Sequence, residues 1–433
     1  MARRGFGWPA LLALLVLAAA GPAPAQELKA VLRQAPLTAG RWLPAGARLG
    51  AALSTRPREV LIGVAAGGRA PYLVRLGRLA FRSPLVLGGR AGRLGLSCAT
   101  CHPAGATNAR FFVPGNSDRP GNADLSHGLF NRKAEDNRAD AVNIPALRGL
   151  RFTAPYGRDG RIGTIRAFTR NVIAVEFGGD EPPALVLDAL VAYQREFGFL
   201  PNPVLGSGGV LTAAASPEAR AGERQFVADC AGCHLPRAGF VDGRAYDVGT
   251  GGYFETPTLL GLAESAPYLH DGRAADLAQV VRHFSAALGL GYGTAEVDHM
   301  VAYLDAVGAA PGARVPVTLS ADLNDIADFA DLILAPLNDE DAGLADRIVD
   351  LTRFQLGRVH ERFPGPDHGA ARDILAGWSR DLSRVAALAR DRRFPAARDL
   401  LRAVIDGLTH GRGSLEAVLE TSLYNPERLA EAQ

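Results

Sequence analysis

Two short stretches, Cys98-Ala-Thr-Cys101-His102 and Cys230-Ala-Gly-Cys233-His234, contain all four cysteines of this 433-residue chain. In each stretch two cysteines stand three positions apart, and a histidine follows directly. No thiol is left over for a disulfide elsewhere, so a disulfide-stapled fold is excluded. Disorder is excluded as well, because 48% of the residues are hydrophobic and can form a core.

A Cys-x-x-Cys pair has three common uses: a redox disulfide, half of a zinc site, or covalent attachment of haem. Paired zinc motifs usually lie about 15–20 residues apart, whereas Cys98 and Cys230 are 132 positions apart. A redox motif needs no histidine after its second cysteine, but both copies have one. Two thioethers would hold the haem, and the adjacent imidazole would reach its iron. The motifs therefore predict two covalently bound c-type haems, with His102 and His234 as iron ligands.

The first 25 residues have the features of a cleaved export signal. Arg3 and Arg4 precede an apolar run over residues 9–20, and Ala23-Pro24-Ala25 is typical of a cleavage site. The alternative is an uncleaved N-terminal anchor, but this run is short for a bilayer, and no later stretch reaches the ~20 apolar residues of a membrane helix. We expect an exported, periplasmic protein without a membrane span.

The charge of the chain indicates no nucleic-acid partner. The sequence has 47 basic and 45 acidic residues, and the expected signal removes two arginines and no acid. The mature chain is therefore balanced, and it lacks the dense basic stripe of a nucleic-acid binder.

The sequence around the two motifs is duplicated. Before the second motif, Gly222 and Phe226 stand four positions apart on one face of an expected helix, and the stretch 76–81 has a similar role before the first. Downstream, three further elements recur. They are Asn143-Ile144-Pro145 and Thr256-Pro257, Ala154-Pro155-Tyr156-Gly157-Arg158-Asp159-Gly160-Arg161 and Ala266-Pro267-Tyr268-Leu269-His270-Asp271-Gly272-Arg273, and the steps Ala192-Tyr193 and Ala302-Tyr303.

Over about residues 70–310 the chain resembles the bacterial di-haem cytochrome c peroxidases and their MauG-type relatives. The resemblance implies a mainly α fold with two class-I cytochrome c-like haem domains in tandem. We therefore expect a signal peptide (1–25), an N-terminal domain with the peroxide-reactive haem (26–205) and a C-terminal domain with the electron-transfer haem (206–311). A helical bundle extension (312–433) follows.

The resemblance also implies a carboxylate that moves protons at the first haem. The family has a glutamate shortly after the first Asp-Gly-Arg stretch, and Glu176 stands at the matching place; a surface glutamate in a turn is the alternative. The family also has a distal histidine that occupies the iron until activation. His127 lies in the corresponding region, although a solvent-facing loop histidine is the better explanation for it.

The second haem lacks the ligand that peroxidases of this family have. They hold this iron with histidine and methionine, which raises its potential. Phe284 stands where the methionine is expected, and MauG-type relatives also replace the methionine. Nearby candidates are His283, Tyr292 and His299; we favour His283, with a helix-surface histidine as the alternative. Met300, the one methionine after Met1, lies on the closing helix and is expected in the core.

Two further expectations concern the region between the haems. Family members place a tryptophan before the first Asp-Gly-Arg, whereas this chain has Arg158, which suits a bidentate contact with a haem propionate. The family also binds calcium between its domains through an asparagine side chain and backbone oxygens. Asn143 matches that asparagine, and a turn-forming asparagine is the alternative.

The extension shows helical periodicity in several blocks. Asp322, Asp325, Asp328 and Asp331 recur every three residues and give its first block an acidic face. A later apolar stripe is broken by one polar residue, Gln355. We expect these helices to cover apolar surface or to form a homodimer, rather than to dock a specific partner.

Three functions fit these observations. The leading one is a periplasmic peroxidase that reduces hydrogen peroxide with electrons from a small cytochrome c or cupredoxin. A MauG-type enzyme would use peroxide to oxidise tryptophan or tyrosine residues of a partner protein, and the absent methionine favours it. The third is a dihaem cytochrome that transfers electrons without catalysis.

Overall fold

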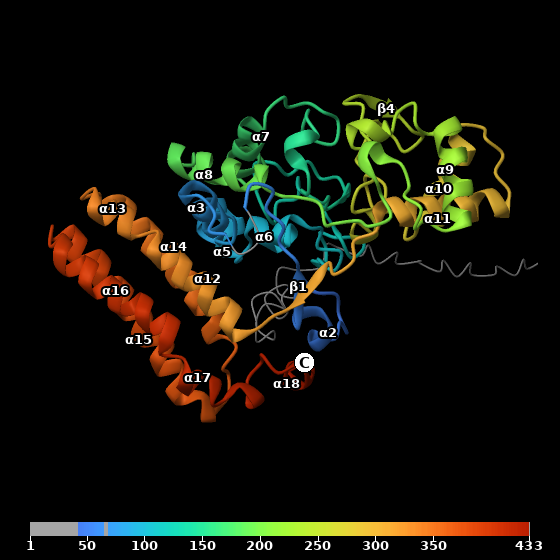
Figure 1. Cartoon of the computed structure of the whole chain (residues 1–433). Coiled ribbons are helices and arrows are strands. Elements are labelled where there is room, and N and C mark those ends of the chain that lie inside the picture. The colour runs from blue at the N-terminus through green and yellow to red at the C-terminus, as the bar shows by residue number, and fades with distance from the viewer. Residues whose placement is uncertain (1–41, 65–67, 433) are drawn as a thin grey trace, which may run out of the picture.

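The computed structural model describes residues 42–64 and 68–432, so the predicted signal peptide lies outside the described residues. The chain is mainly α-helical, as the sequence predicts. The sheets of the described part are three short antiparallel strand pairs. None of the described helices is long and apolar enough to cross a membrane. Figure 1 shows three groups of helices: one around α3 and α8, one around α9 and α11, and a long arm formed by the C-terminal helices.

The first group surrounds the first cysteine motif, and its core contains the aromatic residues Phe81, Phe111 and Phe130. Its elements are α3 (Tyr72–Phe81), α4 (Pro84–Leu87), α5 (Gly89–Arg93), α6 (Cys98–Cys101), β2 (Asn122–Ala123), β3 (Val142–Asn143), α7 (Ile165–Asn171), the π-helix η4 (Val172–Glu176) and α8 (Ala184–Arg195).

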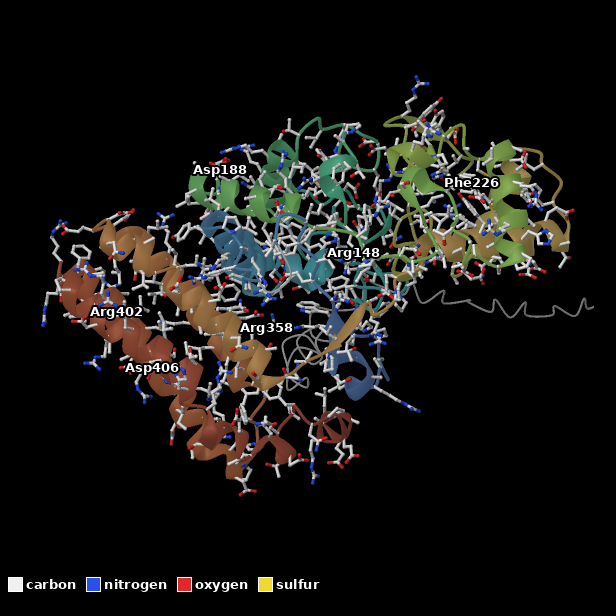
Figure 2. The ribbon with its side chains drawn as sticks, in the orientation of Figure 1. Arg148, Asp188, Phe226, Arg358, Arg402 and Asp406 are labelled. Carbon is white, nitrogen blue, oxygen red and sulfur yellow. The ribbon has the colours of Figure 1, made fainter. Side chains whose placement is uncertain are left out.

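The second group surrounds the second motif and is smaller. Met300 is buried in its core, where the sequence places it. In Figure 2 the labelled Phe226 lies among the helices of this group. Its elements are α9 (Pro217–Asp229), β4 (Ala245–Asp247), β5 (Tyr253–Glu255), α10 (Leu277–Ala287) and α11 (Thr294–Gly308).

A close helix crossing occurs once in each group and rests on a glycine. A Cβ atom on Gly77 of α3 would lie 1.9 Å from the carbonyl oxygen of Ala189 on α8. A Cβ atom on Gly222 of α9 would lie 2.0 Å from the carbonyl oxygen of His299 on α11. Backbones can approach this closely only where the side chain is a hydrogen atom. The expected helix with Gly222 on its packing face is present.

Aromatic rings pack directly beside both crossings. Phe81 and Tyr193 meet edge to face with ring centroids 5.4 Å apart. Phe226 and Tyr303 meet at 4.7 Å in a tilted arrangement. Such contacts add about 0.5–1.5 kcal/mol to the area that the rings bury. The duplication seen in the sequence is therefore also a duplication of three-dimensional packing.

The C-terminal helices share a core of their own that also reaches α3 through Leu76 and Leu79. They are α12 (Leu319–Asp331), α13 (Leu334–Asn338), α14 (Ala342–His360), α15 (Gly369–Arg390), α16 (Phe394–His410), α17 (Gly413–Glu416) and α18 (Pro426–Glu431). Figure 2 places the labelled Arg402 and Asp406 on α16, on the side of the arm away from α3. Gln355, the break in the apolar stripe, is buried and donates a hydrogen bond to the carbonyl oxygen of Arg82 at 3.3 Å.

The acidic face of α12 meets a row of arginines on and around α3, and we call this contact the ionic seam. Asp325 lies 2.8 Å from Arg78 and 2.7 Å from Arg82. The other members extend the seam along both helices: Asp322, Asp328, Asp331, Arg56, Arg69 and Arg75. The aspartates recur every three residues because one face of a helix returns at that spacing.

The ionic seam continues into the core of the first group. Arg78 also pairs with Glu59 at 2.8 Å, and Glu59 accepts a hydrogen bond from the hydroxyl of Tyr193. Burial would raise the pKa of Asp325, but the charges of Arg82 and Arg78 hold it well below its ordinary value of 3.8. The arm is therefore attached by paired charges, and those at the centre of the seam, Arg78, Arg82 and Asp325, are largely removed from water.

The segments before and after the two groups are joined by strands. β1 (Thr55–Pro57) pairs with β6 (Arg314–Pro316) in antiparallel register. Buried Arg148, labelled near the centre of Figure 2, donates to the carbonyl oxygen of Arg58 at 2.7 Å and to that of Gly198 at 3.1 Å. The short helix α2 (Leu49–Leu53) packs on α18 through Leu49 and Leu429.

Gly77→Ala is expected to lower stability, because the new methyl group would meet the backbone of α8. We expect a loss of about 2–3 kcal/mol in the free energy of unfolding, measured by urea denaturation of the holoprotein. Gly357→Ala is the matched control, since nothing lies within 4 Å of a Cβ there. The control should gain about 0.5–1 kcal/mol from helix propensity. Equal effects of the two substitutions would contradict the crossing.

Asp325→Asn should cost about 2–3 kcal/mol at neutral pH, because it leaves Arg78 and Arg82 without their shared carboxylate. A depressed pKa adds stability above the pKa of the unfolded state, and that stability is lost as the pH falls through the folded value. The difference between wild type and variant should therefore shrink on acidification below about pH 4. Asp350→Asn, which breaks an exposed pair with Arg353, should cost about 0.5 kcal/mol or less at any pH.

Candidate functional site

The two motif histidines are held in matching ways. Nδ1 of His102 lies 2.9 Å from the carbonyl oxygen of Pro145. Nδ1 of His234 lies 3.1 Å from the carbonyl oxygen of Phe240, and the carbonyl of Pro257, the counterpart of Pro145, also raises its pKa. A carbonyl can only accept, so each Nδ1 carries the proton and Nε2 keeps its lone pair for a metal.

The chemistry of the motif residues fits a c-type haem. The four cysteines are free, so their sulfur atoms are available for thioether bonds. Burial lowers the pKa of His102 to about 4, and it also lowers the pKa of His234. Both imidazoles are therefore neutral at physiological pH, which is the form that binds iron.

Arg158 is a buried cation near the contact between the two repeats. Burial lowers the pKa of its guanidinium to about 10, although the charge of Asp271 opposes this. Its charge in turn depresses the pKa values of His102 and His270, so it lies near both repeats. Among the described residues no carboxylate lies within ion-pair distance of it. A haem propionate would supply that partner.

The two repeats exchange equivalent backbone hydrogen bonds. The amide of Asn143 donates to the carbonyl oxygen of His270 at 2.8 Å. The amide of Glu255 donates to the carbonyl oxygen of Arg158 at 2.7 Å. Asn143 and Glu255 each stand two positions before a proline, and Arg158 and His270 occupy the same place in their repeats. The interface is therefore pseudo-symmetric.

The side chain of Asn143 reaches across this interface. Its amide group lies 2.6 Å from the carbonyl oxygen of Pro267 and 3.3 Å from that of Leu269, while its own Oδ1 is buried without a partner. If the side-chain amide is turned by 180°, Oδ1 of Asn143 takes the place of its nitrogen and lies beside the carbonyl oxygens of Pro267 and Leu269. Such an oxygen set suits a calcium ion. No group of three His, Cys, Asp or Glu side chains in the described ranges is arranged around a metal ion.

Glu176 is the last residue of the π-helix, and it is a held carboxylate rather than a free surface group. Its Oε1 accepts hydrogen bonds from Arg161 and Asn171, both at 3.1 Å, and 18% of the side chain is exposed. Burial raises its pKa above 4.5, while the charge of Arg161 works in the opposite direction. Arg161 comes from the first Asp-Gly-Arg stretch, so two sequence motifs meet here.

The remaining candidate ligands are engaged in local contacts. Nδ1 of His127 accepts from the amide of Leu129 at 3.0 Å. Nε2 of His283 lies 2.8 Å from the carbonyl oxygen of Val248, and the adjacent Phe284 is half-buried. Their roles as iron ligands stay predictions.

Sequence reasoning did not single out Glu255 or the pair Phe254–His270. Burial raises the pKa of Glu255 to about 7, and the charges of Asp242 and Asp159 add to the shift. The rings of Phe254 and His270 stack with centroids 4.0 Å apart, and Nδ1 of His270 is buried without a partner. An alignment of the two repeats on their prolines, which places Glu255 opposite Asn143, would have pointed to both.

No family model matches this chain. Among curated proteins it is 34% identical to the methylamine utilization protein MauG of Methylorubrum extorquens over 174 residues. These residues are 37% of this chain and 44% of that protein, so the match spans less than half of the relative's length. The two cysteine motifs and their neutral histidines fit a c-type haem. Over the matched residues the chain is similar to MauG, a relative of the di-haem cytochrome c peroxidases.

Two solved structures match this chain at low sequence identity and with TM-scores below 0.5. A chain of Kuenenia stuttgartiensis hydrazine synthase is 19% identical with a TM-score of 0.40, covering 71% of this chain and 98% of that one. A MauG-like protein associated with microbial copper homeostasis is 18% identical with a TM-score of 0.39, covering 58% and 93%.

Proposed function

We propose that this protein is an exported di-haem peroxidase that reduces hydrogen peroxide to water with electrons from a small cytochrome c or cupredoxin. Each peroxide takes up two electrons and two protons and gives two waters. The observation that carries the proposal is Glu176, a mostly buried carboxylate with a raised pKa at the position where the family moves protons. It agrees with the relationship to MauG.

Two haems, attached at Cys98 with Cys101 and at Cys230 with Cys233, would supply the electron chemistry when bound. The chain provides their neutral histidine ligands, and Arg158 would hold a propionate. A calcium ion held by Asn143 and the carbonyl of Pro267 would fix the two repeats against each other.

Glu176 would move the proton between the two peroxide oxygens. As a carboxylate it would accept a proton from one oxygen, and as an acid it would return that proton to the departing oxygen. Arg161 and Asn171 hold Oε1 in place, so the second carboxyl oxygen is the one available for the transfer. The π-helix directs the side chain by giving the backbone a wider turn at this point.

Glu176→Gln should lower peroxide turnover by about 100-fold or more, because the amide cannot accept the proton. The measurement is steady-state peroxide reduction by the holoprotein with a reduced small cytochrome c. Glu181→Gln is the matched control, since Glu181 is exposed and, among the described residues, pairs with Arg170 alone. Because the pKa of Glu176 is raised, its carboxylate becomes protonated at a higher pH than that of an ordinary glutamate. As the pH is lowered, turnover should therefore begin to fall at a higher pH. Arg161→Met removes a charge that lowers this pKa, so it should shift the fall in turnover to a still higher pH.

Unchanged turnover in Glu176→Gln would refute this role. An absence of peroxide turnover in the wild type would instead favour the third function, electron transfer without catalysis.

A second function is favoured by one specific observation. Phe284 stands where peroxidases of the family have methionine, and the curated relative is MauG. A MauG-type enzyme would use peroxide to oxidise tryptophan or tyrosine residues of a partner protein. His283 remains the candidate for the other ligand of the second iron.

Spectroscopy on the holoprotein separates the two functions. The mass of the exported protein should exceed that of its chain by two haems, and removing Cys230 and Cys233 should leave one. EPR should then show one high-spin haem and one low-spin haem without a methionine signature if the MauG-type function is correct. A histidine–methionine signature would favour the peroxidase and would show that Phe284 does not mark the ligand position.

A further inference from the structure

A cavity of about 440 Å³ lies on the outside of the first group, next to the π-helix. We call it the basic pocket. Three segments far apart in sequence form it: α5, residues 130–133, and the two residues that follow Glu176. Its chemistry comes from four cationic and two aromatic side chains: Arg90, Arg93, Arg132, Lys133, Phe130 and Phe177.

The cations of the basic pocket have no acidic counterpart. No aspartate or glutamate from the described ranges lines the cavity. None of the four cations is within ion-pair distance of a carboxylate in the described part of the chain, while Arg90 donates to the carbonyl oxygen of Leu129 at 3.2 Å. The arginines of the ionic seam, by contrast, are each paired with an aspartate. Four like charges around one cavity repel each other, and a bound anion would relieve that repulsion.

The floor of the basic pocket is apolar. Phe130 is buried with 2% of its surface exposed, and its ring centroid lies 5.5 Å from that of Phe177. Both rings pack against the core that holds the first cysteine motif. An aromatic floor under a cationic rim suits a ligand with an apolar body and an anionic end.

The walls of the basic pocket are rigidly joined. A Cβ atom on Gly179 would lie 2.1 Å from the carbonyl oxygen of Leu87, and one on Gly89 would lie 3.0 Å from that of Gly178. Nδ2 of Asn131 donates to the carbonyl oxygen of Val175 at 2.8 Å. These contacts hold the three segments together, so the cavity is formed before any ligand arrives.

We infer that the basic pocket is a binding site for a carboxylate ligand whose apolar part rests on the half-buried ring of Phe177, which Phe130 supports from below. The arginines bind the carboxylate, and the aromatic floor selects against a bare inorganic anion. The carboxylate belongs either to a small molecule or to an acidic segment of a partner protein. This site is independent of the proposed peroxidase activity, although it adjoins Glu176.

The test is calorimetric titration of the holoprotein with benzoate and with benzyl alcohol, its neutral analogue. Benzoate should bind and benzyl alcohol should not, and benzoate binding should weaken as salt is raised. Arg93→Glu combined with Lys133→Glu should weaken benzoate binding by about 10-fold or more. Arg237→Glu, a change at an exposed arginine beside the second cysteine motif, should leave it unchanged.

A second titration with a blocked peptide of alternating glutamate and phenylalanine separates the two sources. Tighter binding of the peptide than of benzoate assigns the site to an acidic protein segment, and the reverse order assigns it to a small carboxylate. Absence of binding by both probes, or equal binding of benzoate and benzyl alcohol, overturns the inference. Because these measurements use binding alone, they stand whether or not the protein reduces peroxide.

Discussion

The contact between Gly77 and the backbone of α8 is the constraint on which the first half of the molecule depends. It brings Tyr193 against Phe81, and the hydroxyl of Tyr193 reaches Glu59. Glu59 orients Arg78, and Arg78 binds Asp325 on the C-terminal arm. One close backbone approach therefore determines both the packing beside the first cysteine motif and the place where the arm attaches. A larger residue at position 77 would disturb all of these contacts together.

The second repeat reproduces this crossing but uses different side chains at the interface between the repeats. Asn143 and Glu255 make equivalent backbone hydrogen bonds, yet one presents a neutral amide and the other a carboxyl group with a pKa of about 7. Arg158 and His270 also occupy equivalent positions, but the first carries a guanidinium and the second an imidazole with a lowered pKa. Duplication supplied a common backbone, and substitution at these positions gave the two sides distinct electrostatics.

Local patterns in the sequence predicted much of this structure. Spacing predicted the glycine-bearing helix and the acidic face of α12, because each depends on residues close together in the chain. The partner of that acidic face could not be predicted, since α3 lies about 250 positions earlier. The basic pocket could not be predicted for the same reason, because three segments far apart in sequence form it. Glu176 was proposed from the family resemblance, but its contact with Arg161 became visible only in the structure.

The pairing of β1 with β6 joins the chain just before the first repeat to the chain just after the second. Both repeats therefore lie within one loop of chain that this strand pair closes. A cut in the linker between the repeats would leave the two halves joined through the β1–β6 pair. The repeats are thus restrained at their outer ends as well as across their shared face.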